Sequence, residues 1–167
     1  LNQVNHTGNF VEFIIGGNSA DTFTISGPRN GNLSGGPGND GFNFADSATL
    51  NGGLDGQTGS NTLSYAAYTS PRSIQLTAAN GITGFDGSEA NFVTGGFKGI
   101  DTLIGSSATD IIIGADLANI WTILANSHQL RVGGSSLSFS EIETVTGGSL
   151  ADTFNLQSSN VASLTLQ

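Results

Sequence analysis

The sequence predicts an all-β fold, namely a parallel β-solenoid of the β-roll or β-helix kind whose coils contain about 18–21 residues. Three observations lead to this prediction. Apolar and polar residues alternate in short runs, no segment has the pattern of a convincing amphipathic helix, and a nine-residue frame recurs along the chain. The 167 residues include 25 glycines, 10 % charged residues and 37 % hydrophobic residues, which is enough apolar material for one ordered domain.

The nine-residue frame begins with glycine, has Asp or Asn at its sixth position and usually a large apolar residue at its eighth, as in GGPGNDGFN. Seven segments fit it: 16–24, 35–43, 56–64, 96–104, 105–113, 114–122 and 147–155. Their sixth positions are Asp21, Asp40, Asn61, Asp101, Asp110, Asn119 and Asp152. Glycine permits backbone conformations closed to other residues, and Asp and Asn favour turns, so each frame predicts a corner.

A strand is expected after most of these corners, because apolar residues stand two and four positions past the Asp or Asn. The pairs are Phe23/Ile25, Phe42/Phe44, Leu63/Tyr65, Trp121/Ile123 and Phe154/Leu156. Midway between the early corners, Asn30-Gly31 and Asn51-Gly52 predict further turns. Antiparallel hairpins in a β-sandwich are the alternative, since Asn-Gly is also a strong hairpin signal. The solenoid is preferred because stacked coils explain why one frame recurs.

The sequence also contains a repeat that is longer than the nine-residue frame. Residues 141–156, EIETVTGGSLADTFNL, repeat the pattern of residues 10–25, FVEFIIGGNSADTFTI, at an offset of 131 residues. We therefore expect residues 1–167 to form a single solenoid segment, in which 10–140 are one full tandem period and 141–167 open the next. The expected partners are neighbouring repeats of the same protein, stacked head to tail.

GGPGNDGFN resembles the nonapeptide of the repeats-in-toxin (RTX) proteins. This resemblance implies a right-handed parallel β-roll in a secreted bacterial protein, with Ca²⁺ held between successive turns. Carried over by position, Asp40 would supply carboxylate oxygens, and Gly36 and Gly38 would supply backbone carbonyls. The same carry-over to the other frames gives the candidate metal ligands Asp21, Asp101, Asp110, Asn119 and Asp152.

Most of the chain, from 59–76 through 91–114 to 136–154, is also similar to repeats of very large bacterial surface proteins. These are described variously as β-strand-repeat, filamentous-haemagglutinin-like or Ca²⁺-binding repeat proteins. The resemblance implies a secreted, extracellular or cell-surface location. A glycan of the cell surface is a further candidate partner.

The chain departs from the RTX pattern in ways that leave calcium open. The fourth-position glycine remains only at Gly38, Gly59 and Gly99. Calcium takes about six to eight oxygen ligands, and a β-roll site needs the same corner from adjacent coils. Asp101 with Asn119, and Asp21 with Asp40, have suitable spacings. Two interpretations remain: at least one corner binds Ca²⁺, or the corner side chains only cap backbone N–H groups.

The charge and the chemistry of the side chains exclude several functions. Thirteen acidic against four basic residues give a net charge of −9, which would repel nucleic acids and anionic membrane surfaces. No apolar run is long enough to span a membrane, so membrane insertion is not expected. The two histidines, His6 and His128, are isolated, and the acidic pairs Asp86/Glu89 and Glu141/Glu143 fit solvated loops or faces better than a catalytic site.

The sequence therefore predicts a protein that is not an enzyme: a structural repeat module of a long extracellular bacterial surface or filament protein, acting as a spacer, fibre or adhesin shaft. A Ca²⁺-responsive RTX-type module attached to a secreted enzyme or toxin is the first alternative. A polysaccharide-active β-helix is the second.

Overall fold

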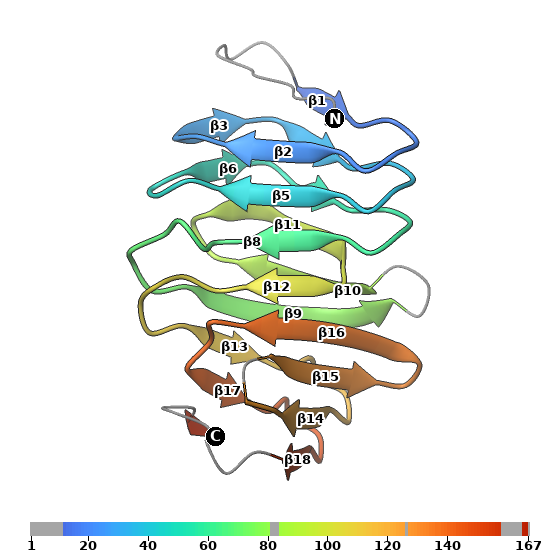
Figure 1. The fold of residues 1–167 in the computed structure, drawn as a ribbon, viewed down its shortest axis with the longest axis vertical. Coiled ribbons are helices and arrows are strands. Elements are labelled where there is room, and N and C mark those ends of the chain that lie inside the picture. The colour runs from blue at the N-terminus through green and yellow to red at the C-terminus, as the bar shows by residue number, and fades with distance from the viewer. Residues whose placement is uncertain (1–11, 81–83, 126, 158–164, 167) are drawn as a thin grey trace.

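The computed structural model describes residues 12–80, 84–125, 127–157 and 165–166, and their regular structure consists of β-strands alone (Figure 1). The all-β prediction is confirmed. The strands form two sheets; within each sheet the strands follow one another along the long axis of the molecule, and the two sheets enclose one apolar core.

The eight-stranded sheet has the order β18-β14-β15-β16-β12-β8-β5-β2. Its strands are β2 (Thr22–Ile25), β5 (Gly41–Phe44), β8 (Thr62–Ser64), β12 (Thr102–Ile104), β14 (Ile120–Ile123), β15 (His128–Val132), β16 (Ser135–Ser140) and β18 (Thr153–Leu156). Strands β2, β5, β8, β12 and β16 pair in parallel, as do β14 and β18. The β14–β15 and β15–β16 pairs are antiparallel.

The eleven-stranded sheet follows the path β1-β4-β7-β11-β10-β9-β13-β17-β19, with β3 and β6 joined beside it. Its strands are β1 (Phe13–Ile15), β3 (Pro28–Asn30), β4 (Asn32–Ser34), β6 (Thr49–Asn51), β7 (Leu54–Asp55), β9 (Ser73–Asn80), β10 (Gly84–Glu89), β11 (Val93–Ile100), β13 (Ile111–Ile113), β17 (Thr144–Thr146) and β19 (Thr165–Leu166). The β9–β10 and β10–β11 pairs are antiparallel, and the other pairs are parallel.

Both sheets are thus mixed, whereas the sequence predicts parallel pairing throughout. Two segments, 73–100 and 120–140, add antiparallel strands between parallel ones. Neither the interior of β9–β11 nor the β15–β16 hairpin contains a complete nine-residue frame. Alternating apolar residues specify a strand with one buried face, but they do not specify the direction of its neighbour.

Each of the seven frames ends on a strand that begins directly after the sixth position. The strands are β2, β5, β8, β12, β13, β14 and β18. Their eighth positions point into the core, where Phe42, Leu63 and Trp121 are fully buried. Parallel register places these side chains above one another, so Phe23 stacks on Phe42 with ring centroids 4.9 Å apart. At the other end, Trp121 and Phe154 stack with centroids 6.2 Å apart.

Residues 10–25 and 141–156 share one pattern at an offset of 131 residues, and we call this pair of segments the echo. Their described parts lie at opposite ends of the molecule (Figure 1). In the described residues, 12–25 form β1 and β2, and 141–156 form β17 and β18. Strands β2 and β18 are the two edge strands of the eight-stranded sheet. The equivalent sequences therefore fold into equivalent strands, one in each sheet.

Candidate functional site

The sixth positions of the frame form a column of hydrogen bonds along the corners, which we call the corner ladder. The Asp21 N–H donates to Asp40 Oδ1 at 2.8 Å, across 19 residues of sequence. The Asp40 N–H donates to Asn61 Oδ1 at 2.9 Å, and the Asn61 N–H donates to Asp101 Oδ2 at 2.9 Å. Each acceptor side chain of the ladder thus binds the backbone at the preceding corner. We call a corner together with the strand that follows it a layer.

Two shorter ladders repeat this arrangement elsewhere. The Arg72 N–H donates to Asp110 Oδ1 at 2.6 Å, and the Asp110 N–H donates to Glu143 Oε2 at 2.7 Å. The Asn119 N–H donates to Asp152 Oδ1 at 2.9 Å. In each case the acceptor comes from the residue later in the sequence, so all three ladders run in one direction.

Binding the backbone is a property of every aspartate in the chain. Each of the nine accepts at least one hydrogen bond from a backbone N–H: Asp21, Asp40, Asp46, Asp55, Asp86, Asp101, Asp110, Asp116 and Asp152. Buried N–H groups without a partner are costly, at about 1–3 kcal/mol each. The aspartates therefore act first as internal connectors between segments of the backbone.

The structure brings together one of the two predicted metal pairs. Asp21 and Asp40 are neighbours in the corner ladder. The pairing of Asp101 with Asn119 is wrong, because β16 and β15 lie between β12 and β14 in the sheet. Asp101 instead meets Asn61, and Asn119 meets Asp152. The inserted hairpin 128–140 changes the neighbour that an 18-residue spacing in the sequence predicts.

The two predicted glycine ligands lie where successive layers approach each other closely. Gly36 has a φ of +91° and Gly38 a φ of +152°, both in the region that favours glycine. A Cβ at Gly38 would lie 2.7 Å from the backbone of Ser19. A Cβ at Gly36 would clash with the backbone of Gly17. These positions need glycine for the turn and for layer contact, whether or not a cation is present.

Calcium can be tested against the oxygen atoms that the corners offer. Asp40 Oδ1 accepts the Asp21 N–H, whereas Asp40 Oδ2 is buried and has no hydrogen-bond partner in the described residues. Burial raises the pKa of the Asp40 carboxyl, while the hydrogen bond from Asp21 lowers it. Within the described part of the chain, no three His, Cys, Asp or Glu side chains form a group that could hold a metal. Calcium binding remains a prediction, and Asp40 Oδ2 is the oxygen best suited to it.

Asparagines form a second set of interlayer contacts at the opposite corners. Asn51 Nδ2 donates to Asn30 Oδ1 at 3.0 Å, and Thr94 Oγ1 donates to Asn51 Oδ1 at 3.0 Å. The Gly53 N–H donates to Asn32 Oδ1 at 2.8 Å. The turns predicted at Asn30-Gly31 and Asn51-Gly52 are therefore stacked, with their side chains linked from layer to layer.

A buried ion pair is the cluster that sequence reasoning missed. Arg72 and Glu89 are 3 % and 2 % exposed, and Arg72 Nη1 lies 3.2 Å from Glu89 Oε1. The guanidinium also packs over two rings that are nearly perpendicular to each other, 4.2 Å from the centroid of Tyr68 and 3.6 Å from that of Phe92. Such an arrangement combines charge pairing with cation–π contact in a dry interior.

The environment of Glu89 changes its acidity. Burial raises the pKa of Glu89 to about 7, although Tyr65 and Arg72 lower it. Assigning Asp86 and Glu89 together to a solvated loop is therefore wrong for Glu89. The signal was present in the alternation of β10, where Phe85, Gly87 and Glu89 all face inward. The pairing with Arg72 was not visible, because it depends on the antiparallel strands.

His128, which is isolated in the sequence, belongs to the eight-stranded sheet. It is on β15, 9 % exposed, and its ring packs against Phe139 with centroids 5.1 Å apart. Its Nδ1 accepts the Leu124 N–H at 3.3 Å. Burial lowers the pKa of His128 and so favours the neutral ring. His6 lies outside the described residues.

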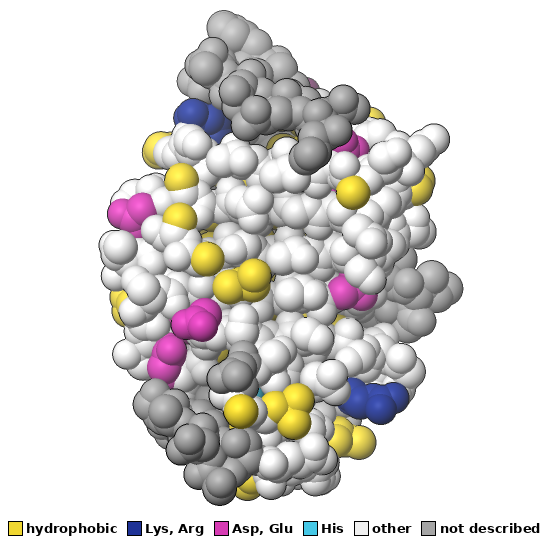
Figure 2. All heavy atoms as spheres, viewed as in Figure 1, with side chains coloured by type: hydrophobic (Ala, Val, Ile, Leu, Met, Phe, Trp, Pro, Cys, Tyr) yellow, Lys and Arg dark blue, Asp and Glu magenta, His cyan; other side chains and the backbone are white. Residues whose placement is uncertain are grey.

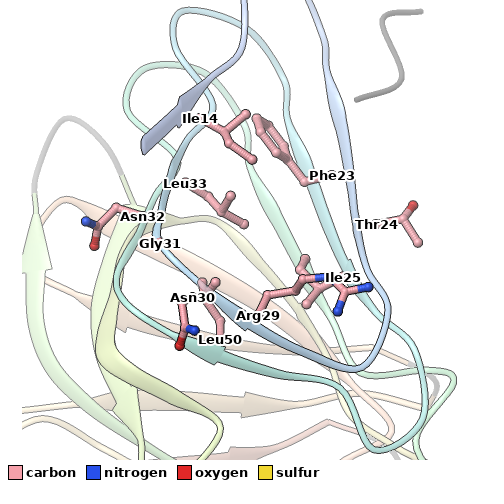
Figure 3. A pocket seen from close by; sticks show the side chains of 10 residues that line it. All are labelled: Ile14, Phe23, Thr24, Ile25, Arg29, Asn30, Gly31, Asn32, Leu33 and Leu50. Atoms are coloured by element: carbon pink, nitrogen blue, oxygen red, sulfur yellow. The ribbon is translucent and has the colours of Figure 1, made fainter. Parts of the chain in front are cut away.

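One small hollow lies at the N-terminal end of the core, beneath β1 (Figure 3). Ile14, Phe23 and Leu33 point into it, whereas Thr24 points away at the rim. Its volume is about 50 Å³, room for a few water molecules at most. On the face shown in Figure 2, charged side chains are few and separated by uncharged polar surface.

No family model matches the sequence, and no curated protein and no solved structure matches it. Among the described residues, no helix has the length and apolar character needed to span a membrane.

Proposed function

We propose that this chain is a structural repeat module of a long extracellular bacterial surface or filament protein, where it acts as a spacer, fibre or adhesin shaft. The observation that carries the proposal is the use of the aspartates. All nine bind backbone N–H groups, and several of these bonds join segments 19 to 40 residues apart. Carboxylates that accept these hydrogen bonds hold successive layers together.

On this proposal, the two sheets are the walls of a β-solenoid that two antiparallel insertions interrupt. The early hydrogen bonds of the corner ladder span 19 and 21 residues, which supports coils of that length. The bond from Asn61 to Asp101 spans 40 residues, because the strands β9 to β11 are inserted there. A rod of stacked layers suits a protein that must set a distance or bear tension.

The proposed location is outside the cell, and the proposed partners are neighbouring repeats of the same protein. The resemblance to RTX proteins and to large bacterial surface repeats supports this location. The 131-residue echo supports a tandem arrangement, because its two copies fold alike at opposite ends of the molecule.

Surface labelling tests the proposal. An antibody raised against folded residues 12–157 should label intact cells of the source organism, and it should detect a chain much larger than 17.0 kDa. Mass spectrometry of that chain should find several copies of the 131-residue period. A parent protein close to 17.0 kDa, or one found only inside the cell, would rule the module out.

A Ca²⁺-responsive module is the second candidate, favoured by the buried and unpartnered Asp40 Oδ2. Circular dichroism with EGTA or with millimolar Ca²⁺ separates the two. For the structural module we expect full β signal in EGTA, because the corner N–H groups already have acceptors. We also expect a melting midpoint that rises in calcium for the native chain and not for Asp40→Asn. If β signal forms only in calcium, the responsive module is correct instead.

A further inference from the structure

We propose that consecutive repeats merge into one continuous pair of sheets, in which β17 and β18 of one repeat serve as β1 and β2 of the next. This inference rests on the proposed function and deepens it by naming the partner of the C-terminal end. The partner is the segment equivalent to residues 26–44 in the following repeat, and no linker separates the two repeats.

Each copy of the echo shows one of the two neighbours of the same kind of strand: β18 shows the neighbour before it, and β2 shows the neighbour after it. Strand β18 pairs with β14 before it, in the register Trp121↔Phe154. Strand β2 pairs with β5 after it, in the register Phe23↔Phe42. Both pairs are parallel, and Phe154 and Phe23 are equivalent positions of the echo. Superposing the two gives a stack in which the Phe42 of the next repeat covers Phe154.

The corner hydrogen bonds that precede β18 and β2 complement each other in the same way. Asp152 accepts the Asn119 N–H of the layer before it, and Asp21 donates its own N–H to Asp40 in the layer after it. In the described residues, no acceptor is present for the Asp152 N–H. The carboxylate of the next repeat's Asp40 would bind this N–H and extend the ladder.

Burial differs between the equivalent positions of β2 and β18. Ile25 is 4 % exposed, whereas its equivalent Leu156 is 62 % exposed. Phe23 is 7 % exposed, and Phe154 is only half-buried. These apolar positions follow the same alternation and both strands are edge strands, so the difference means that β18 has less cover than β2 within the described residues.

The other sheet already contains the first strand of that layer. After β2 the chain crosses over, and β4 pairs in parallel with β1. Strand β19 pairs in parallel with β17, although its register (Thr144↔Thr165) is shifted by two residues relative to that of β4 with β1 (Phe13↔Asn32). In the described residues, the second period thus begins its next layer in the same sheet and in the same strand direction as the first.

A fused chain tests this inference directly: residues 1–156 followed at once by residues 26–167. Its second half lacks β1 and β2, so it can complete its first layer only by using β17 and β18 of the first half. We expect one cooperative unfolding transition, with a midpoint at or above that of the 167-residue chain. The isolated segment 26–167 is the matched control and should melt at a lower temperature.

Two further measurements make the outcome decisive. The Asp152 amide should exchange at least about tenfold more slowly in the fused chain than in the native one. Asp40→Ala in the second half alone should lower the midpoint as much as Asp40→Ala in the first half alone.

A second half that melts like isolated 26–167 would overturn the inference. If the fused chain does not fold, the shorter chain 1–156 plus 26–55 decides, and an unprotected Asp152 amide there also overturns it. Either result would leave a chain of separate modules possible, since surface labelling and the repeat number test the proposed function independently.

Discussion

At the scale of single residues, the corner carboxylates satisfy backbone groups that the fold would otherwise bury without partners. Asp110 shows this most clearly: it is fully buried and accepts hydrogen bonds from the Arg72 N–H, the Ser106 N–H and the Ser106 hydroxyl. A side chain in this position is valuable because its absence leaves several donors unpaired at once.

We expect Asp110→Ala to reduce the free energy of unfolding by about 2–3 kcal/mol, because it leaves buried N–H groups without an acceptor. Asp110→Asn keeps one side-chain oxygen and should cost about half as much. Urea denaturation measures both. Glu12→Ala is the control, since that side chain is exposed and its loss should stay within about 0.5 kcal/mol. Equal effects at Asp110 and Glu12 would contradict this role.

The buried Glu89 predicts a pH dependence with a definite sign. Its pKa is raised from 4.5 in the unfolded chain to about 7 in the folded one, so the folded state holds the proton more tightly. Stability should therefore fall as pH rises from 4.5 to about 7, and this contribution should be constant above that range. His128 acts in the opposite sense, because its lowered pKa favours the folded state as pH rises towards 6.5.

The variant Glu89→Gln separates these two contributions. The difference in unfolding free energy, native minus variant, should decrease by up to about 3 kcal/mol between pH 4.5 and pH 7.5. Urea denaturation at several pH values gives this difference, and the His128 contribution cancels in it. A difference that is flat or increases with pH would show that Glu89 is ionised throughout the range.

At the scale of strands and turns, the glycines decide how closely one layer can approach the next. Gly59 stands at the fourth position of its frame, with a φ of +125°, and a Cβ added there would clash with the carbonyl of Gly38. The turn between β15 and β16 gives a useful comparison. There Gly133 has a φ of +57° but open space around it, and Gly134 has neither constraint.

Alanine at these three glycines should give graded losses. Gly134→Ala should be nearly neutral, and Gly133→Ala should cost about 1–2 kcal/mol from backbone strain alone. Gly59→Ala should cost more than either, because strain is joined by a clash with the neighbouring layer. Thermal melting of the three variants measures the order. Equal losses of stability for Gly59→Ala and Gly133→Ala would mean that close approach between layers adds nothing to the cost of the substitution.

The sequence predicts these elements well wherever the frame is present. The frame places the starts of seven strands and the inward direction of Phe42, Leu63 and Trp121. It fails at 73–95 and at the β15–β16 hairpin, where alternation remains but the repeated corner is lost. In the candidate site, Asp21 with Asp40 was predictable because nothing is inserted between their layers. The contacts Asn61–Asp101 and Arg72–Glu89 depend on the inserted strands, and local spacing does not contain that information.

At the scale of the whole molecule, stability should be highest in the middle and lowest at the ends, because a central layer has two neighbours and an end layer has one. The aromatic positions of the frame offer a direct comparison. Phe42 is fully buried between the layers of β2 and β8, whereas Phe154 is half-buried on the edge strand β18.

Phe42→Ala should therefore cost about 3–5 kcal/mol, as expected for a fully buried aromatic ring. Phe154→Ala should cost less than half of that, because part of its surface is already in contact with water. Chemical denaturation of the two variants measures the ratio. Equal losses would mean that the C-terminal layer is as well packed as the centre.

The direction of the ladders has a consequence for the order of folding. In each ladder the earlier residue supplies the N–H and the later residue supplies the oxygen. A chain that leaves a ribosome N-terminus first presents donors that stay bound to water until the next acceptor arrives. A chain that emerges from a secretion pore C-terminus first presents acceptors that are already in place for the next donor. The end of the chain that emerges first thus determines whether the N–H donor or the oxygen acceptor of each ladder hydrogen bond is in place before its partner.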